Sequence, residues 1–338
     1  MKIARYGRLI TLFLAFLPTM ITLAGGPAQG DESRAGIELQ GTIRVSGAWA
    51  LYPMMVKWSG EFRKTCQGVR IDISAGGAGK GIADVLSGLV DIGMVSREVT
   101  PEEVKRGTCY VPVVRDAVFP TMNRRNPALN ILLQRGVKKE TFIDWWIKGG
   151  VLTWGEAAGL SPPNTVKNRI HVYTRSDSCG AAETWAQYLG GKNQEDLKGI
   201  GVYGDPGLAE VVRKDVLGVG YNNLSCAYDF RTALPLDGLV IIPIDVNENG
   251  KVDAGESLKT KNEAIRAINS GVYPSPPARA LYLVTKTGFR GPSKGFIQWI
   301  LTEGQKYVEE AGYIRLPKAM VTESLRKLKA ESKTQKPL

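Results

Sequence analysis

Histidine is almost missing from this chain of 338 residues, which holds only His171. Cysteine is scarce too, and the spacing of the 4 cysteines gives no zinc signature. The chain also lacks the repeats or long low-complexity segments that a surface adhesin or scaffold protein would need. The composition is otherwise that of a globular protein, with 43% hydrophobic and 23% charged residues, and the length allows two cores.

No segment after residue 30 is apolar enough to cross a bilayer. Residues 1–30 have the pattern of a secretory signal peptide, because basic residues precede an apolar run over 9–24 and small residues follow at Ala28–Gly30. A membrane anchor is the alternative, but the run is short for a span and Pro18 interrupts it. No cysteine precedes Cys66 that could carry a lipid, so we expect a soluble exported protein.

The formal net charge of +11 includes the cations of the N-terminal segment and of a polar basic tail, residues 319–338. Such a tail could contact nucleic acid in principle. Export and the lack of a basic-aromatic recognition motif favour a solvated helix that frays. We therefore expect no nucleic-acid partner.

Cys66 and Cys109 fall near element ends in the same half of the chain, so they are a reasonable disulfide pair in an exported protein. Cys179 and Cys226 would then remain, either paired with each other or free.

The first half of the chain alternates strands and helices around glycine-rich turns. The expected order is strand 42–46, turn 47–50, helix to about 65, strand 69–73, turn 76–81, helix 82–89 and strand 90–95. This order predicts a parallel sheet with right-handed crossovers, whose ligands bind off the carboxyl ends of the strands. The turn 76–81 is not a nucleotide P-loop, because Ser74 stands at the position of its first glycine.

A third unit of the same kind covers residues 171–184. A short strand leads into the turn Ser176–Gly180, and a helix follows that stops at Gly190. The unpaired N–H groups at the start of this helix, beside Arg175, form a site suited to an anion.

Two longer strands, Val111–Met122 and Ala280–Thr285, have no helix paired with them and suit crossovers between two lobes. Further helices are expected at Leu129–Gly159, Asp205–Asp215 and Phe296–Ala311, and further strands at Gly218–Tyr221 and Leu239–Ile244.

The order of these motifs resembles the periplasmic phosphate-binding proteins of ABC transporters over about Gly41–Pro317. Four stretches carry the resemblance: Val45–Pro53 (first phosphate loop), Gly77–Gly93 (second loop and the strand after it), Phe142–Trp154 (helix, glycine, tryptophan) and Thr174–Gly180 (the Arg-x-Asp-Gly-Ser-Gly-Thr loop). The resemblance implies an α/β, two-lobed periplasmic-binding fold of type 2, in which each lobe is a mostly parallel sheet flanked by helices and two crossover strands join the lobes. Lobe 1 would hold residues 36–116 and 280–318, and lobe 2 residues 117–279.

The same resemblance implies a monomeric periplasmic protein, not an enzyme, that closes over one anion and hands it to an ABC transporter permease. Phosphate is the leading ligand, and another oxyanion or a small carboxylate is the alternative. The candidate ligand-binding residues are Ser46, Ala48, Trp49, Ala50, Gly77, Ala78, Gly79, Ser96, Arg97, Arg175, Asp177, Ser178, Cys179, Gly180 and Ala181.

The chain departs from this family where hydroxyl and acid groups are expected. Ala48–Ala50 replace the Ser and Thr of the first loop, Ala78 the serine of the second, and Cys179 and Ala181 the Ser and Thr of the third, while Ser96 replaces an aspartate. A hydrogen bond to a charged group contributes about 1.5–3 kcal/mol. Phosphate binding should therefore be weaker, unless backbone N–H groups, Ser46, Arg97 or Ser178 substitute.

A separate motif, Asp245–Glu256, fits the twelve-residue EF-hand calcium loop, with Gly250 at its sharp turn. An acidic surface turn is the alternative. We expect a structural Ca²⁺ held by Asp245, Asn247, Asn249, the Lys251 carbonyl, Asp253 and Glu256.

A cysteine enzyme is the rival class of function. Cys179 at a helix start could be a nucleophile, with His171 as its base. His171 is separated from it by a strand and a turn, and no third orienting residue is identified. A strand histidine and a small buried cysteine are the simpler interpretation.

Overall fold

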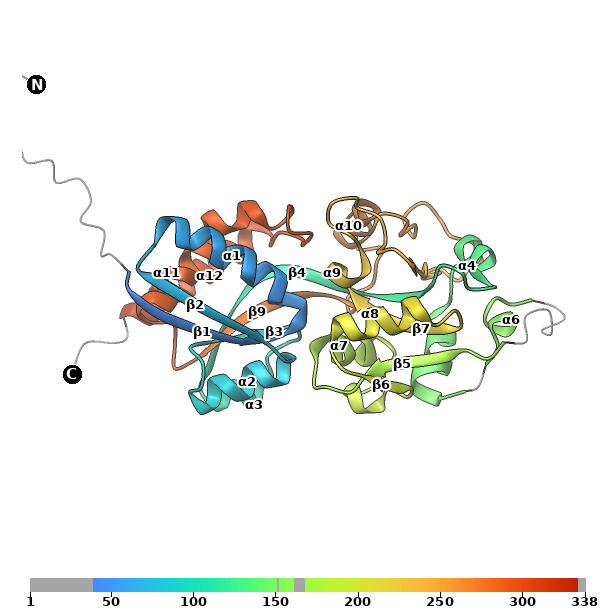
Figure 1. Ribbon diagram of the computed structural model, residues 1–338, viewed down its shortest axis with the longest axis horizontal. Helices are drawn as coiled ribbons and strands as arrows, with labels where there is room; N and C mark the ends of the chain where they lie inside the picture. The colour runs from blue at the N-terminus through green and yellow to red at the C-terminus, as the bar shows by residue number, and fades with distance from the viewer. Residues whose placement is uncertain (1–38, 151, 161–167, 334–338) are drawn as a thin grey trace, which may run out of the picture. The chain divides into compact units, whose positions relative to one another are not determined.

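The computed structural model describes residues 39–150, 152–160 and 168–333, which belong to one compact unit, Glu38–Leu338 (Figure 1). The signal-peptide pattern of residues 1–30 lies outside the described residues. Within the described ranges, no helix has both the length and the apolar character needed to span a membrane.

Nine strands are described: β1 (Gly41–Gly47), β2 (Val69–Ala75), β3 (Ile92–Val95), β4 (Thr108–Asn123), β5 (His171–Arg175), β6 (Ile200–Val202), β7 (Gly218–Asn223), β8 (Leu239–Ile241) and β9 (Ala278–Lys286). The α-helices are α1 (Tyr52–Thr65), α2 (Ala78–Ser87), α3 (Pro101–Lys105), α4 (Leu129–Arg135), α5 (Lys139–Ile143), α6 (Trp154–Ala157), α7 (Gly180–Tyr188), α8 (Asp205–Lys214), α9 (Leu224–Ala227), α10 (Lys261–Ser270), α11 (Gly291–Leu301) and α12 (Lys318–Lys333). Short 3-10 or π turns are η1 (Trp49–Leu51), η2 (Asp144–Lys148), η4 (Gln194–Asp196) and η5 (Glu303–Tyr307).

The strands form a sheet in the order β2-β1-β3-β9-β4-β7-β5-β6, with β8 also paired to β4. β1 pairs in parallel with both β2 and β3, as the β-α-β-α-β order predicts. β5 is likewise parallel to β6 and β7. The carboxyl ends of these parallel strands therefore lead into the glycine-rich turns.

Two separate hydrophobic cores lie along this sheet, and we name the surrounding elements lobe 1 and lobe 2. The core of lobe 1 draws its buried residues from 43–114 and 281–328, and includes Trp58 and Phe296. The core of lobe 2 draws on 117–278 and on Ile314. Its centre is a group of mutually contacting aromatic rings that includes Phe142, Trp145, Trp146, Trp154 and Trp185.

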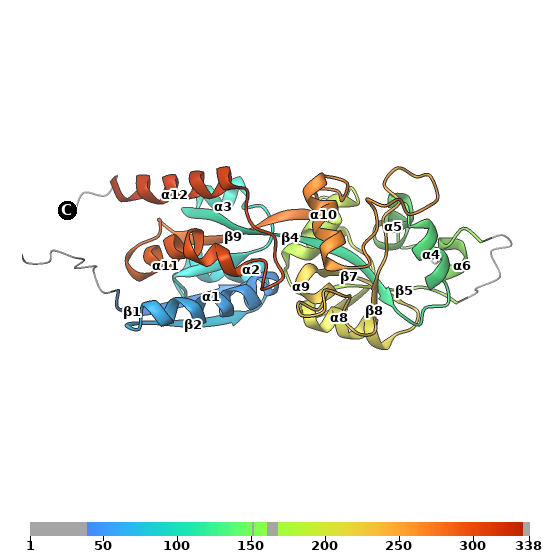
Figure 2. The ribbon, with the colours of Figure 1, turned by 90° about the horizontal axis from the view of Figure 1, so that it is seen from above.

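β4 and β9 are the two crossover strands. β4 pairs with β9 over Thr108–Ala117, and then with β7 and β8 over Val118–Asn123. Figures 1 and 2 show both strands passing from the elements of lobe 1 to those of lobe 2. The α/β two-lobed architecture with two crossovers is thus confirmed.

Two helical predictions were too long. The stretch Leu129–Gly159 is broken into α4, α5, η2 and α6, because Gly136 and Gly149 both have φ of 71° and α6 starts with its own capping box at Thr153. The predicted helix Phe296–Ala311 begins earlier, at Gly291, and ends at Leu301, where η5 takes over. Apolar spacing continued through both breaks and concealed them.

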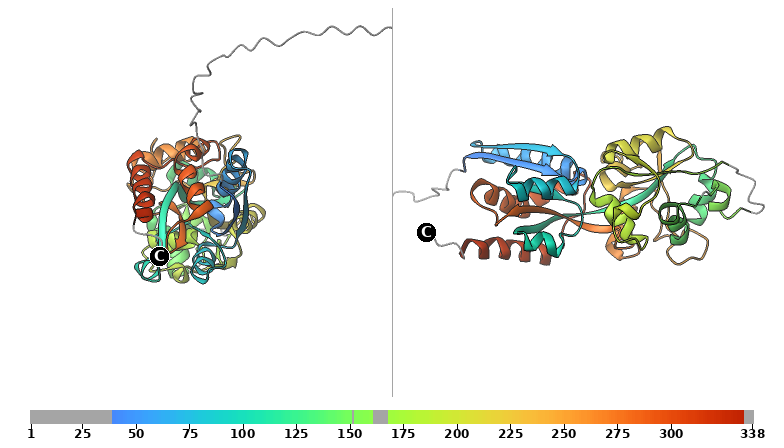
Figure 3. Two further views of the ribbon diagram at one scale, coloured as in Figure 1. Left: turned by 90° about the vertical axis from the view of Figure 1, so that its left-hand side faces the viewer. Right: turned by 90° about the horizontal axis from the view of Figure 1, so that it is seen from below.

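The C-terminal segment and the cysteines also differ from expectation. α12 packs on α11 and β4, and Leu328 on it is 3% exposed, so this segment closes the core of lobe 1 rather than standing free as a basic tail (Figures 2 and 3). Among the cysteines, Cys66 is a free thiol, so the expected Cys66–Cys109 disulfide is not formed. Cys179 and Cys226 are free as well.

Candidate functional site

Three turns at the carboxyl ends of parallel strands meet between the lobes: loop 1 (residues 47–51), loop 2 (residues 76–80) and loop 3 (residues 176–180). The carbonyl of Gly47 in loop 1 accepts hydrogen bonds from the N–H groups of Gly76 and Gly77, at 2.9 and 3.1 Å. Gly47 has φ of 130°, and a β-carbon there would strike the backbone of Met94. Loop 1 therefore needs glycine at this position, and it fixes the position of loop 2.

Loop 2 contacts loop 3 across the lobes. The N–H of Gly79 donates to the carbonyl of Ser178 at 3.4 Å, and neither Gly77 nor Gly79 has room for a β-carbon beside Ser178. The predicted residues Ala78, Gly79, Ser178 and Gly180 are thus brought together by the fold.

The two helices that follow these loops begin at this contact. α2 starts at Ala78 and α7 at Gly180, so the positive ends of two helix dipoles meet, one from each lobe. Like partial charges at close range repel, and an anion between them would offset that repulsion while accepting the helix-start N–H groups. The geometry therefore suits a small anion.

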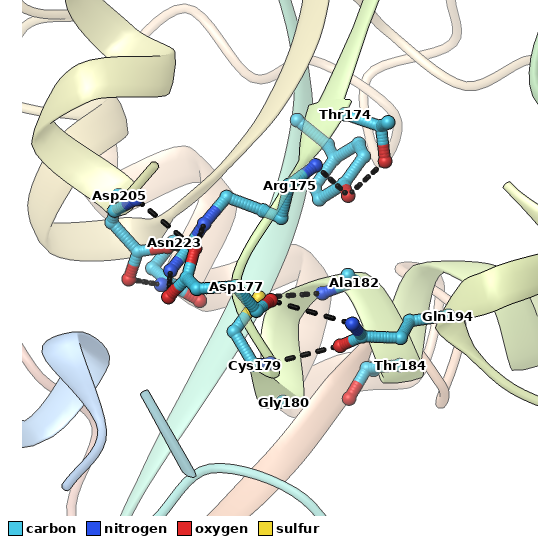
Figure 4. A network of polar contacts seen from close by, with 12 residues as sticks. Thr174, Arg175, Asp177, Cys179, Gly180, Ala182, Thr184, Gln194, Asp205 and Asn223 are labelled. Carbon is cyan, nitrogen blue, oxygen red and sulfur yellow. Dashed lines mark hydrogen bonds and ion pairs between the residues drawn. The ribbon is translucent and has the colours of Figure 1, made fainter. Parts of the chain in front are cut away.

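Arg175 does not carry the free charge that the sequence suggested. Its guanidinium is fully buried and forms ion pairs with two carboxylates (Figure 4). Asp177 accepts from Nε at 2.8 Å and from Nη2 at 2.5 Å, and Asp205 accepts from Nη1. The arginine is thus neutralised and orients loop 3. Asp177 also accepts the N–H of Gly204 at 3.1 Å, which ties the start of α8 to loop 3.

The network continues from loop 3 into the crossover strands. Asn223 donates to Asp205 and accepts from Arg279 of β9, whose Nη1 also donates to the Gly180 carbonyl. Arg279 Nη2 lies 3.3 Å from Asp116 Oδ2 on β4. Burial raises the pKa of Asp116 and lowers the pKa of Arg279, because each charged form loses water. The strands that join the lobes are therefore in direct polar contact with loop 3.

Two other polar candidates are already engaged with partners in lobe 1. The Ser46 hydroxyl donates to Asp84 at 2.7 Å, and Lys80 forms an ion pair with the same carboxylate. Arg97 binds both oxygens of Glu103, at 2.7 and 3.0 Å. Both side chains are therefore held by carboxylates of lobe 1.

Trp49 of loop 1 reaches lobe 2. Its ring meets that of Tyr203 edge-on, with centroids 6.3 Å apart and planes at 88°, and it would lie 3.6 Å from a β-carbon at Gly204. Among the described residues, its buried indole N–H has no hydrogen-bond partner. The candidate site also includes four buried alanines, Ala48, Ala50, Ala78 and Ala181. Their side chains have no polar atoms, so only backbone groups can bind a ligand at these positions.

Cys179 serves as the cap of α7. Its Sγ accepts the N–H of Ala182 at 3.3 Å, and its own N–H donates to Gln194 Oε1 at 2.8 Å. His171 lies at the opposite end of β5, where Nδ1 is 2.7 Å from Asp215 Oδ2. Four residues of strand span about 13 Å, so these two side chains do not form the dyad that a cysteine enzyme needs.

Sequence reasoning missed Asp205, Asn223, Arg279 and Asp116. Each is a buried polar residue that lies within or next to a strand or helix made mainly of buried apolar residues. Buried charged residues are rare unless they are paired. The position of Asp116 within the apolar run Val111–Met122 could therefore have indicated a buried ion pair. Its partner could not be named without the fold.

The loop Asp245–Glu256 has the internal bonds of a preformed turn. Asp245 accepts the N–H groups of Asn249 and Gly250, at 3.1 and 2.9 Å, and Glu256 accepts that of Val246 at 2.8 Å. Asp245 is 2% exposed and Glu256 6%. No group of three or more His, Cys, Asp or Glu placed to hold a metal ion is found among the described residues, so a cation here would depend on amide and carbonyl oxygens as well.

Comparison with known proteins decides the family. A model described as a PBP superfamily domain matches residues 32–303. The chain belongs to this superfamily. The phosphate-binding protein PstS of Xylella fastidiosa is 24% identical to it, covering 91% of this chain and 94% of that protein. PstS of Methanocaldococcus jannaschii is 25% identical, with 91% of each chain covered.

Solved structures agree on the fold of this PBP superfamily member. A candidate phosphate ABC transporter substrate-binding protein from Clostridium perfringens, with bound phosphate, has a TM-score of 0.66 at 20% identity, covering 82% of this chain and 100% of that one. An ABC-type phosphate transport receptor from Vibrio cholerae has a TM-score of 0.58 at 17% identity, with the same coverage. The resemblance drawn from the sequence motifs is confirmed.

Proposed function

We propose that this protein is a periplasmic binding protein, not an enzyme, that captures phosphate between loops 1, 2 and 3 and delivers it to an ABC transporter permease. The relatives named phosphate-binding protein PstS support this ligand, and the similar structure named as a phosphate ABC transporter substrate-binding protein supports this partner. The observation that carries it is the meeting of α2 and α7, one helix start from each lobe, where Gly79 contacts Ser178.

Phosphate would be held mainly by backbone N–H groups, and the surrounding arginines are already paired with carboxylates. Arg97, Arg175 and Arg279 each have a carboxylate partner, so the site adds hydrogen bonds to the anion more than net positive charge. A buried site in which donors are fixed in advance needs little reorganisation on binding. The Trp49 N–H has no hydrogen-bond partner among the described residues, so it could donate to the anion without breaking a bond within the protein.

Entry and release would require the lobes to part. Loops 2 and 3 are in direct contact, and β4 and β9 carry the chain from one lobe to the other. Bending at the crossovers would disturb the Arg279–Asp116 pair and the bond from Arg279 to Gly180. Closure over the anion would restore both and exclude water from the site.

Another oxyanion is the second candidate ligand. Asp177 and Asp205 both face Arg175, and Ser96 offers a hydroxyl where the family has an aspartate, so no carboxylate stands at that position to accept a hydrogen bond from the proton of hydrogen phosphate. Sulfate carries no such proton and would need no acceptor.

A ligand screen separates these candidates. The mature protein would be tested by thermal shift and calorimetry with phosphate, sulfate, molybdate, tungstate and small organic acids. A ligand at one hundred times its Kd stabilises the fold by about 2.7 kcal/mol, so the physiological anion should give the largest shift. A large shift with another solute and none with phosphate would overturn the leading assignment.

We further propose that the loop Asp245–Glu256 binds Ca²⁺ as a structural ion. Its spacing of oxygen-bearing residues supports this, as do the near-complete burial of Asp245 and the φ of 77° at Gly250. The ion would stabilise lobe 2 rather than act as a switch, because the loop lies outside the three anion loops.

A further inference from the structure

A concave site lies beside the crossover strands, and its lining includes no residue of the three loops. It is a cavity of about 290 Å³ whose walls come from both lobes. Its polar lining consists chiefly of Arg97, Glu98, Arg115, Thr184, Gln187 and Arg279. Ligand pockets in proteins run from about 300 Å³ upwards, so this cavity lies at the lower end of that range and has room for a small molecule only.

Arg115 is the cation of this wall that remains available. Among the described residues its guanidinium makes one hydrogen bond, from Nη1 to Asn269 Oδ1 at 3.2 Å, and no ion pair. The other two arginines form ion pairs, Arg97 with Glu103 at 2.7 Å and Arg279 with Asp116 at 3.3 Å. An anion that enters the cavity would therefore be drawn to Arg115, whose planar fork suits a carboxylate.

The base of the cavity is polar and incompletely paired. The Arg279 side chain is 6% exposed, and its Nε has no hydrogen-bond partner within the described part of the chain. Its Nη1 donates to Thr184 Oγ1 at 2.9 Å and to the Gly180 carbonyl. These bonds fix the Arg279 side chain, and its buried Nε is closed to an occupant as well as to water, so Arg115 is the accessible guanidinium of the cavity.

The remaining wall limits the charge and shape of that occupant. Glu98 is exposed, and its Oε1 accepts the Tyr282 hydroxyl at 2.8 Å, so a carboxylate lies beside the cavity. A second charge on the ligand would be repelled there. Ala278, Ala280 and Met320 provide apolar surface on the same cavity. The lining thus combines one available cation, neutral polar groups and an apolar face.

We propose that this cavity binds a small organic monocarboxylate, with its carboxylate on Arg115 and its apolar part against Ala280 and Met320. The site does not depend on the proposed phosphate site. Because its walls belong to both lobes, an occupant would favour the lobe arrangement described here over one with the lobes apart.

The test uses the full mature protein and calorimetry with butyrate and benzoate, with butyramide and benzamide as uncharged matches. Butyrate or benzoate should bind, and the amides should not. Arg115→Gln should weaken carboxylate binding at least about tenfold. Ala280→Leu keeps every charge and fills the cavity, so it should weaken binding as well. Arg266→Gln, an exposed arginine on α10, is the matched control and should bind like the wild type.

Three results would overturn the proposal: no heat and no thermal shift with either carboxylate, unchanged affinity in both Arg115→Gln and Ala280→Leu, or displacement of the carboxylate by phosphate in strict competition. The last would place the carboxylate at the three loops. Phosphate titrations of the same variants distinguish the cavity proposal from the proposed phosphate site, because Arg115→Gln should leave phosphate affinity within about twofold of the wild-type value. A protein that binds butyrate but no phosphate would refute only the proposed function.

Discussion

The backbone of Gly180 in lobe 2 is pressed against Ser96 in lobe 1, with no room between them for a β-carbon. Gly180 is the first residue of α7 and Ser96 follows β3, so a helix start and a strand end that lie 84 positions apart in sequence meet here. Function requires the lobes to approach this closely if both helix starts are to reach one anion.

We expect Gly180→Ala to reduce phosphate affinity at least about tenfold while the protein stays folded, since the added methyl group would hold the lobes apart. Calorimetry gives the affinity and circular dichroism the fold. Gly60→Ala is the matched control, because Gly60 also lies in a helix, α1, and its β-carbon would meet nothing within 4 Å. That variant should gain about 1 kcal/mol of stability with unchanged binding. Equal phosphate affinity in both variants would rule out the contact as part of the site.

Cys179→Ser should strengthen phosphate binding by about tenfold. The serine hydroxyl would place a donor at the start of α7, where a hydrogen bond to a charged ligand is worth about 1.5–3 kcal/mol, and serine is also a good helix cap. Cys66→Ser, remote from the loops, is the control. An affinity that falls or stays constant in Cys179→Ser would show that the anion does not reach this helix start.

Calcium should raise the melting temperature, and chelation should lower it. At one hundred times its Kd an ion adds about 2.7 kcal/mol. Asp245→Ala should abolish the calcium-dependent part of the shift, whatever it does to the stability of the apo protein. Asp237→Ala removes the same charge from an exposed side chain and should keep the full shift. If Asp245→Ala responds to calcium like the wild type, the loop is only a surface turn.

Acid should weaken the fold partly through Asp215. Burial raises its pKa, but hydrogen bonds from His171, Tyr173 and the Leu217 N–H outweigh this and lower it below its ordinary value. A carboxyl whose pKa is lower in the folded state stabilises the protein above its unfolded pKa, and that stabilisation is lost as the pH falls through the folded value. The loss should therefore occur below about pH 4.

Denaturant titrations at pH 7 and pH 3 check this expectation. Asp215→Asn should cost about 1–2 kcal/mol at pH 7 and less at pH 3, because the stabilisation by the wild-type carboxylate declines as the pH falls below its unfolded pKa. A pH-independent difference between the two proteins would contradict the assignment of acid sensitivity to this residue.

What could be predicted from sequence was local. Strands such as Val69–Ala75 and the glycine turns around Gly47, Gly77 and Gly180 follow from periodicity and backbone freedom within a few residues. Family resemblance then supplied the order of the lobes. The partners of Arg175 illustrate the limit, because Asp177 is two positions away and foreseeable, whereas Asp205 reaches it only through the packing of α8 on β7.

The neutralisation of the Arg175 charge by two carboxylates was not foreseen from the sequence. A basic residue beside a helix start predicts an anion site only if nothing else claims its charge, and buried arginines are seldom left without carboxylates. The expected Cys66–Cys109 bridge failed for a related reason, since compartment and spacing permit a disulfide but cannot place two β-carbons at bonding distance.

The division of lobe 1 between the two ends of the chain has a consequence for biosynthesis. Its core needs β9, α11 and Leu328, which the ribosome makes last, whereas the core of lobe 2 needs little beyond residue 278. Lobe 2 can therefore fold first, while residues 43–114 keep apolar surface exposed until residues 281–328 have been made. Truncation after β9 would leave that N-terminal segment as a target for chaperones and proteases.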